Sequence, residues 1–154
     1  MVSAPRLKYH QSTFDSLGIV VPSVSSRSLQ AIAELQRSLK IELPESLHEW
    51  YSLEGATRLL RKYEIIDEPA QLDLPDRPLS FGLMGLLEEG FLYLGCTEQA
   101  ICEFAIELDG SEDPPVLVFC AGADFCWRKI HEHFSNFLAV GAMQCRRPRP
   151  NTEC

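Results

Sequence analysis

Lysine and arginine are absent from positions 78 to 127, although nine acidic residues fall in the same window. The rest of the 154-residue chain holds 13 acidic and 14 basic residues, so the net charge of −8 comes from this window. A surface with one sign of charge attracts partners of the opposite sign and disfavours partners of its own sign. The window is therefore expected to bind a basic partner, which favours a binding role over a catalytic one.

Long apolar runs and an N-terminal targeting signal are also lacking. No run of about 18 apolar residues occurs, so the sequence predicts no helix that spans a membrane. The first ten residues contain basic side chains without the continuous apolar core of a secretory signal. We expect a cytoplasmic protein that has no membrane partner.

The six cysteines include no Cys-x-x-Cys pair and no dense framework of the kind found in small secreted domains. Cys96, Cys102 and Cys120 lie in apolar runs, where a reduced cysteine behaves as a small hydrophobic residue. In a cytoplasmic protein these three cysteines are expected to be reduced residues of the core.

Motifs for catalysis and for phosphate binding are missing as well. The chain has no Gly-x-Ser-x-Gly elbow and no lysine-bearing phosphate loop. Cys126, His131 and His133 carry metal-capable atoms, but no complete set of ligands is evident. We predict no enzyme, no cofactor and no metal site, and a small metal-dependent hydrolase that uses these residues is the alternative.

The length suits one domain, predicted over residues 1–154. Residues 1–24 show no sustained period and are expected to form a loosely packed arm, and residues 144–154 a flexible tail. The three arginines of that tail lie in a segment broken by proline and would bind nucleic acid weakly at physiological salt, so no nucleic-acid partner is expected.

Two helices are predicted in the first half of the chain. The first is expected to be capped by Ser28 and to bury apolar residues that recur near helical spacing, namely Leu29, Ile32, Ala33 and Leu39. Pro44 is expected to begin the second helix and Gly55 to end it. The buried stripe of this second helix is predicted to be Leu47, Trp50 and Tyr51.

The second half of the chain is rich in strand signals. Residues 91–96 are apolar on both faces, which predicts a central strand covered on two sides. Residues 101–108 alternate, so one face is expected in the core and the other, which carries Glu103 and Glu107, at least half solvated. The polar turn 109–115 and the apolar run 116–120 predict a hairpin with the preceding strand.

Between these halves, residues 57–66 are expected to form a short helix that runs into a strand, and residues 67–78 a loop. A further short strand at 125–130 and a closing helix over 134–142 complete the pattern. Helices followed by strands and then by a helix favour an α+β fold with an antiparallel sheet. Trp50 and Trp127 are interpreted as core residues, with interface anchors as the alternative.

The order of several motifs resembles the SMI1/KNR4 family, also called the SUKH superfamily. Leu43-Pro44 is followed by the aromatic segment Trp50–Gly55, in which Glu54 stands where the family usually has asparagine. The later motifs that agree are Gly90–Gly95, Asp113–Val116, Trp127 and Phe134–Leu138. The resemblance covers about residues 28–142, and it is carried by the order of the motifs and by no single one.

The resemblance implies an antiparallel sheet with helices packed on it, N-terminal helices and a C-terminal helix. It also implies a bacterial immunity protein that binds and neutralises a cognate toxin, often a nuclease, without catalysis of its own. A regulatory adaptor for an endogenous protein is the alternative. Because a nuclease site must attract phosphates, it tends to be basic, and an acidic protein can occupy it. The candidate toxin-binding residues are therefore Glu88, Glu89, Glu98, Glu103, Glu107, Asp109, Glu112 and Asp113.

Overall fold

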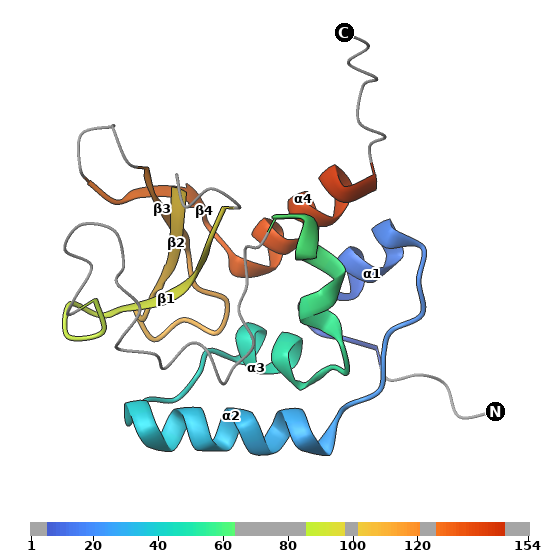
Figure 1. The fold of residues 1–154 in the computed structure, drawn as a ribbon, viewed down its shortest axis with the longest axis horizontal. Coiled ribbons are helices and arrows are strands. Elements are labelled where there is room, and N and C mark those ends of the chain that lie inside the picture. The colour runs from blue at the N-terminus through green and yellow to red at the C-terminus, as the bar shows by residue number, and fades with distance from the viewer. Residues whose placement is uncertain (1–5, 64–85, 98–101, 121–125, 147–154) are drawn as a thin grey trace, which may run out of the picture.

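The computed structural model describes residues 6–63, 86–97, 102–120 and 126–146 (Figure 1). Its helices are α1 (Gln11–Leu17), α2 (Ser26–Leu39), α3 (Glu45–Ser52), the 3-10 helix η1 (Ala56–Tyr63) and α4 (Phe134–Arg146). Its strands are β1 (Phe91–Cys96), β2 (Cys102–Glu107), β3 (Val116–Cys120) and β4 (Arg128–His131). Among the described residues, no helix has the length and apolar character needed to cross a membrane.

The four strands form one antiparallel sheet in the order β1-β2-β3-β4. Each strand therefore pairs with its neighbour in the sequence, and the hairpin predicted between β2 and β3 is confirmed. The prediction of an α+β fold with an antiparallel sheet is also confirmed. The strand over 91–96 is present as β1, which lies at one end of the strand order formed by the described residues.

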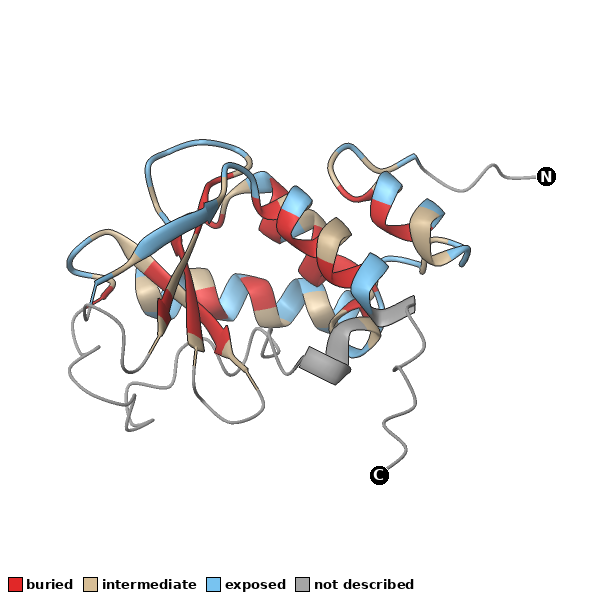
Figure 2. Ribbon diagram, turned by 90° about the horizontal axis from the view of Figure 1, so that it is seen from above, coloured by how far each residue is buried: buried red, intermediate tan, exposed pale blue. Residues whose placement is uncertain are grey.

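One hydrophobic cluster joins the helices to the sheet. It includes Phe14 of α1, Ile32 of α2, Trp50 of α3, Ile106 of β2 and Leu138 of α4. Figure 2 shows the buried residues concentrated on the surfaces where the helices and the sheet face each other. The ring centroids of Phe104 and Phe137 are 5.3 Å apart, which places the predicted core face of β2 against α4.

In the described part of the N-terminal arm, which begins at residue 6, the prediction of loose packing is wrong. Residues 11–17 form α1, which packs on α4. His10, Thr13 and Phe14 are completely buried. The helix has only seven residues, so it buries too few side chains to produce a period that stands out in the sequence.

Helix α2 begins two residues before its predicted cap. Ser25 is the N-cap, and its side chain accepts a hydrogen bond from the backbone N–H of Ser28. Ile32 and Leu35 are the buried residues of this helix, whereas Leu29 and Ala33 are exposed. The helical period was therefore predicted correctly, but the buried stripe is rotated from the predicted one.

Helix α3 follows Pro44 as predicted, and Leu47, Trp50 and Tyr51 are buried as predicted. It ends at Ser52, before the predicted stop. Gly55 has a φ of 71°, a left-handed conformation that favours glycine, and it lies directly before η1. The predicted short helix after position 57 corresponds to η1, while the strand and the loop predicted at 64–78 lie outside the described residues.

The C-terminal helix is longer than expected. Helix α4 continues to Arg146, so the first residues of the predicted flexible tail are helical, and residues 147–154 lie outside the described part. The predicted short strand near 125–130 corresponds to β4, which begins at Arg128. Ser135 is the second residue of this helix.

Two of the cysteines that were expected to be reduced are joined. Cys102 and Cys120 lie directly opposite each other on β2 and β3, with a Cα–Cα distance of 4.2 Å, and they form a disulfide. Both lie in apolar strands as predicted, but the expectation of free thiols is wrong for this pair. The pairing depends on the strand register, which the spacing of the cysteines does not reveal. Cys96 remains a free thiol.

Candidate functional site

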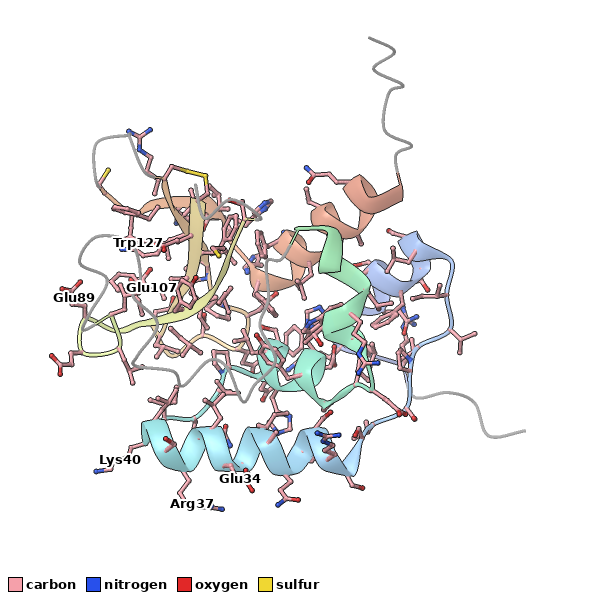
Figure 3. All side chains as sticks on the ribbon, viewed as in Figure 1. Glu34, Arg37, Lys40, Glu89, Glu107 and Trp127 are labelled. Carbon is pink, nitrogen blue, oxygen red and sulfur yellow. A yellow bond between two sulfur atoms is a disulfide. The ribbon has the colours of Figure 1, made fainter. Side chains whose placement is uncertain are left out.

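Four of the eight candidate carboxylates lie together at one end of the sheet. Glu88 and Glu89 belong to the turn before β1, Glu107 ends β2, and Asp109 follows two residues later. All four are exposed. We call this group the acidic edge, and Figure 3 shows Glu89 and Glu107 at the same end of the sheet.

Backbone pairing brings the two parts of the acidic edge together. Phe91 pairs with Glu107 in the β1–β2 register, and the N–H of Leu108 donates to the carbonyl of Gly90 at 2.7 Å. The turn that carries Glu88 and Glu89 is held by a hydrogen bond of 2.8 Å from the N–H of Phe91 to the carbonyl of Leu86. The antiparallel register thus places residues that are about 20 positions apart in the sequence at one edge.

Asp109 is kept ionised by its own turn. The N–H of Ser111 donates to Asp109 Oδ1 at 2.9 Å. Hydrogen bonds from the side chain and then from the backbone of Ser111 lower the pKa of Asp109 below its ordinary value. Because hydrogen bonds to a carboxylate favour its charged form, Asp109 contributes a full negative charge at neutral pH.

Glu103 does not belong to an exposed surface, which corrects its assignment as a candidate contact. Its exposure is 3%, and the neighbouring Ala105 on the same face of β2 is completely buried. Opposite Glu103 lies Phe119, which is buried and packs on Trp127 with 5.6 Å between ring centroids. The face predicted to be half solvated is therefore covered in the middle of β2 and exposed only at Glu107.

Glu112 is exposed but is occupied by contacts within the chain. Its Oε2 accepts hydrogen bonds from Lys8 Nζ at 2.8 Å and from the Tyr9 hydroxyl at 2.7 Å. Glu45 Oε2 accepts from Lys8 Nζ at 2.9 Å and also lies 2.9 Å from the Tyr9 hydroxyl, so the two carboxylates share the single proton of that hydroxyl. The hydrogen bond from Lys8 is the main cause that lowers the pKa of both carboxyls, and Glu112 is the main cause that raises the pKa of Lys8.

Asp113 is also occupied, because it binds the first turn of α4. Its Oδ1 accepts from the backbone N–H of Ser135 at 3.0 Å, and its Oδ2 from the Ser135 hydroxyl at 2.5 Å. The carbonyl of Glu112 accepts from the N–H of Ser46 at 2.9 Å. Glu112 and Asp113 therefore hold the β2–β3 loop against the helices, and their role in binding a partner stays a prediction. Glu98 lies outside the described residues.

Glu49 is a structural carboxylate that no pattern in the sequence identifies. Its two oxygens accept hydrogen bonds from three consecutive backbone N–H groups, of Lys8 at 2.8 Å, Tyr9 at 2.9 Å and His10 at 3.0 Å. These bonds fix the segment before α1 on α3. Their 39- to 41-residue separation explains why no local pattern predicts them.

The three residues considered for a metal site, Cys126, His131 and His133, are not arranged around a common point. His131 lies with its ring centroid 5.7 Å from that of Phe137, and His133 Nδ1 is 3.1 Å from the carbonyl oxygen of Asp113. Cys126 is an exposed free thiol. Within the ranges that the structure describes, no group of three or more His, Cys, Asp or Glu residues is arranged to hold a metal ion.

The two tryptophans differ in burial. Trp50 is completely buried, which confirms its interpretation as a core residue. Trp127 is only partly buried, against Phe119 at the outer face of the sheet.

Comparison of the chain with protein-family models, with curated proteins and with solved structures finds no match. The resemblance to the SMI1/KNR4 family therefore stays a prediction from the order of the motifs. The geometry itself provides an α+β scaffold and an exposed group of four carboxylates.

Proposed function

We propose that the protein is a cytoplasmic immunity protein that binds a basic protein toxin of the nuclease type through its acidic edge and has no catalytic activity of its own. The observation that carries the proposal is the convergence of Glu88, Glu89, Glu107 and Asp109 at one end of the sheet. The resemblance in motif order supports the part of the proposal that names a toxin and its neutralisation. The acidic edge supports the part that concerns how the toxin is bound.

The acidic edge suits recognition because its charges are solvated and of one sign. Neighbouring like charges produce a field that raises the rate of encounter with a basic protein, in a manner that depends on salt. No lysine or arginine occurs between positions 78 and 127 of the sequence, and none of the four residues of the acidic edge forms an ion pair within the described part of the chain. Glu112 lies in the loop that follows the acidic edge, but its ion pair with Lys8 offsets its charge, so the field is assigned to the four residues of the acidic edge.

The test begins with co-expression of this protein and the toxin candidate encoded beside its gene. Relief of growth arrest by the wild-type protein is expected. The variant Glu89→Lys/Glu107→Lys is expected to associate with the toxin on the order of tenfold more slowly at low salt, with a flatter dependence on salt. Stopped-flow or surface-based association kinetics measure both quantities.

Glu34→Lys is the control for the single variants Glu89→Lys and Glu107→Lys, because Glu34 is an exposed glutamate on α2, away from the acidic edge (Figure 3). It changes one charge in the same direction and is expected to leave association nearly unchanged. Equal association rates for the wild type and the double variant would remove the acidic edge as the binding surface. Failure of the wild-type protein to bind or to rescue would reject the immunity function and favour the adaptor.

A further inference from the structure

A groove with a volume of about 310 Å³ lies between the first turn of α2, the end of α3 and the start of η1. Arg27 and Ser28 line it from α2, and Thr57 and Arg58 from η1. Tyr51 and Leu53, both nearly completely buried, contribute the apolar part of its lining. A volume of this size is at the lower end of the range for small-molecule sites.

Backbone hydrogen bonds fix the two walls of the groove relative to each other. The N–H of Ser25 donates to the carbonyl of Ser52 at 2.9 Å, and the N–H of Glu54 donates to the carbonyl of Ser23 at 2.9 Å. Between them, Val24 and Leu53 form an isolated antiparallel bridge. Arg27 and Arg58 follow this junction within a few residues on either side, so the backbone that carries the two arginines is held in place before any ligand enters.

The two arginines form no ion pair that stabilises the described part of the fold. Both are exposed, and within the described part of the chain neither guanidinium has a hydrogen-bond or ion-pair partner. Lys8 and Lys129, by contrast, form ion pairs with glutamates at 2.8 to 2.9 Å. Two unpaired guanidiniums on one groove, in a chain with a net charge of −8, indicate a site for an anionic ligand.

The number of donors favours a phosphoryl group over a carboxylate. Each guanidinium presents a planar fork of N–H donors that can bind two oxygens of one anion. Ser28 and Thr57 add hydroxyl groups to the lining. A carboxylate has only two oxygens, whereas a phosphoryl group has three acceptor oxygens and a charge of about −1.5 to −2.

Glu54 limits the kind of phosphate that the groove accepts. It lies in the lining, and its Oε2 accepts a hydrogen bond of 3.4 Å from the hydroxyl of Ser23. Its negative charge disfavours a second anionic group, while its oxygens can accept hydrogen bonds from ligand hydroxyls. We propose that this groove binds a small phosphate monoester with a hydroxylated organic body, with its phosphoryl group between Arg27 and Arg58.

The groove is separate from the acidic edge. It lies at the end of α2 next to η1, whereas Glu89 and Glu107 lie at the far end of the sheet (Figures 1 and 3). The proposal therefore does not depend on the binding of a toxin, and each can fail without the other.

The probes are glycerol 3-phosphate and inorganic phosphate, with acetate as a carboxylate control and glycerol as an uncharged control. Titration of the isotope-labelled full chain, followed by amide chemical shifts, is expected to give saturable changes in residues 23–28 and 53–58 with both phosphates. Glycerol 3-phosphate is expected to bind more tightly than inorganic phosphate, because its hydroxyl groups can donate hydrogen bonds to Glu54 in the lining. Acetate is expected to bind at least about tenfold more weakly, and glycerol not at all.

Arg27→Gln and Arg58→Gln are each expected to weaken glycerol 3-phosphate binding by about tenfold or more. Arg37→Gln is the matched control, since Arg37 is an exposed arginine on the same helix and outside the groove (Figure 3). Arg27→Lys and Arg58→Lys keep the charge without the fork and are expected to fall between the wild type and the glutamine variants. The thermal midpoint of each variant is expected to match the wild type, because both side chains are exposed.

Three results would overturn the proposal. The first is the absence of saturable shifts in the groove with either phosphate up to about 10 mM, a concentration at which only very weak binding escapes detection. The second is wild-type affinity in both Arg27→Gln and Arg58→Gln. The third is that acetate binds as tightly as inorganic phosphate. This result would show that the groove binds anions in general and does not select a phosphoryl group.

Discussion

Asp113 binds Ser135 through both of its carboxylate oxygens, at 3.0 Å to the backbone N–H and 2.5 Å to the hydroxyl. Ser135 is the second residue of α4, so the carboxylate satisfies one of the backbone donors that have no partner within the helix. A negative charge at this end also complements the helix dipole. One acidic residue of the β2–β3 loop thus stabilises the start of the C-terminal helix, across 22 residues of sequence.

Asp113→Ala is therefore expected to lower the free energy of unfolding by about 1–2 kcal/mol, the usual cost of losing a side chain that caps a helix. Urea denaturation followed by circular dichroism measures the change. Glu107→Ala is the matched control, because Glu107 is acidic and exposed and lies outside the loop; its effect is expected to stay within about 0.5 kcal/mol. Equal stability of the two variants would show that the Asp113 contact does not support α4.

His10 links pH to stability, because it is completely buried between Trp50 and Phe134. Burial lowers the pKa of His10 below its ordinary value of 6.5, although the hydrogen bond to the carbonyl of Ser46 and the charges of Glu49 and Asp113 oppose the shift. The folded state therefore binds the proton less tightly than the unfolded chain. Stability is fully present above pH 6.5 and is lost as the pH falls from there toward the folded pKa.

His10→Gln tests this linkage, since glutamine can donate to the Ser46 carbonyl but does not titrate in this range. The variant is expected to be less stable at about pH 7.5 and to lose less stability than the wild type between about pH 7 and pH 5. His131, whose pKa is also lowered by burial, is present in both proteins and cancels in the comparison. Parallel stability curves for the two proteins would contradict the assignment, and His48→Gln at an exposed position serves as the control.

Gly55 is expected to resist replacement for a purely conformational reason. Its φ is 71°, and a Cβ atom added there would meet nothing within 4 Å. Gly55→Ala is therefore expected to cost about 1 kcal/mol of stability from backbone strain alone, and Gly55→Asn less, because asparagine tolerates the left-handed region. Denaturant midpoints of both variants measure this order. An alanine variant as stable as the wild type would indicate a different backbone at this turn.

The sequence predicted those parts of the fold that depend on local patterns. Helical spacing identified the buried face of α3, and alternation identified Phe104 and Ile106 as core residues of β2. The polar, proline-rich segment 109–115 predicted the hairpin, because proline and glycine favour turns. In each case the signal lies within a few residues of the feature that it predicts.

The candidate site was less predictable, because contacts between residues that are distant in the sequence decide which acidic side chains are exposed. Alternation placed Glu103 on the second face of β2, but its burial depends on the neighbours that cover that face, such as Phe119 on β3. Glu112 is engaged by Lys8, which lies 104 residues away in the sequence. Composition could locate the acidic window, and only the strand register could separate the acidic edge from the carboxylates that hold the fold.

The disulfide between Cys102 and Cys120 is the point at which the structure departs most from the expectation of a cytoplasmic protein with reduced cysteines. Such bonds persist in oxidising compartments and are rare where glutathione keeps thiols reduced. The bond closes a loop with a sequence separation of 18 residues, for which the loss of entropy in the unfolded chain predicts a stabilisation of about 3 kcal/mol.

Oxidised protein is therefore expected to be more stable to urea than the same protein in excess dithiothreitol by about 3 kcal/mol. The variant Cys102→Ser/Cys120→Ser should show no such dependence on reductant, whereas Cys126→Ser, at an exposed free thiol, should retain it. Thiol titration of the denatured wild type should gain two reactive groups on reduction. If the oxidised and reduced proteins have the same stability and thiol count, the pair is a reduced core contact, and the original expectation is restored.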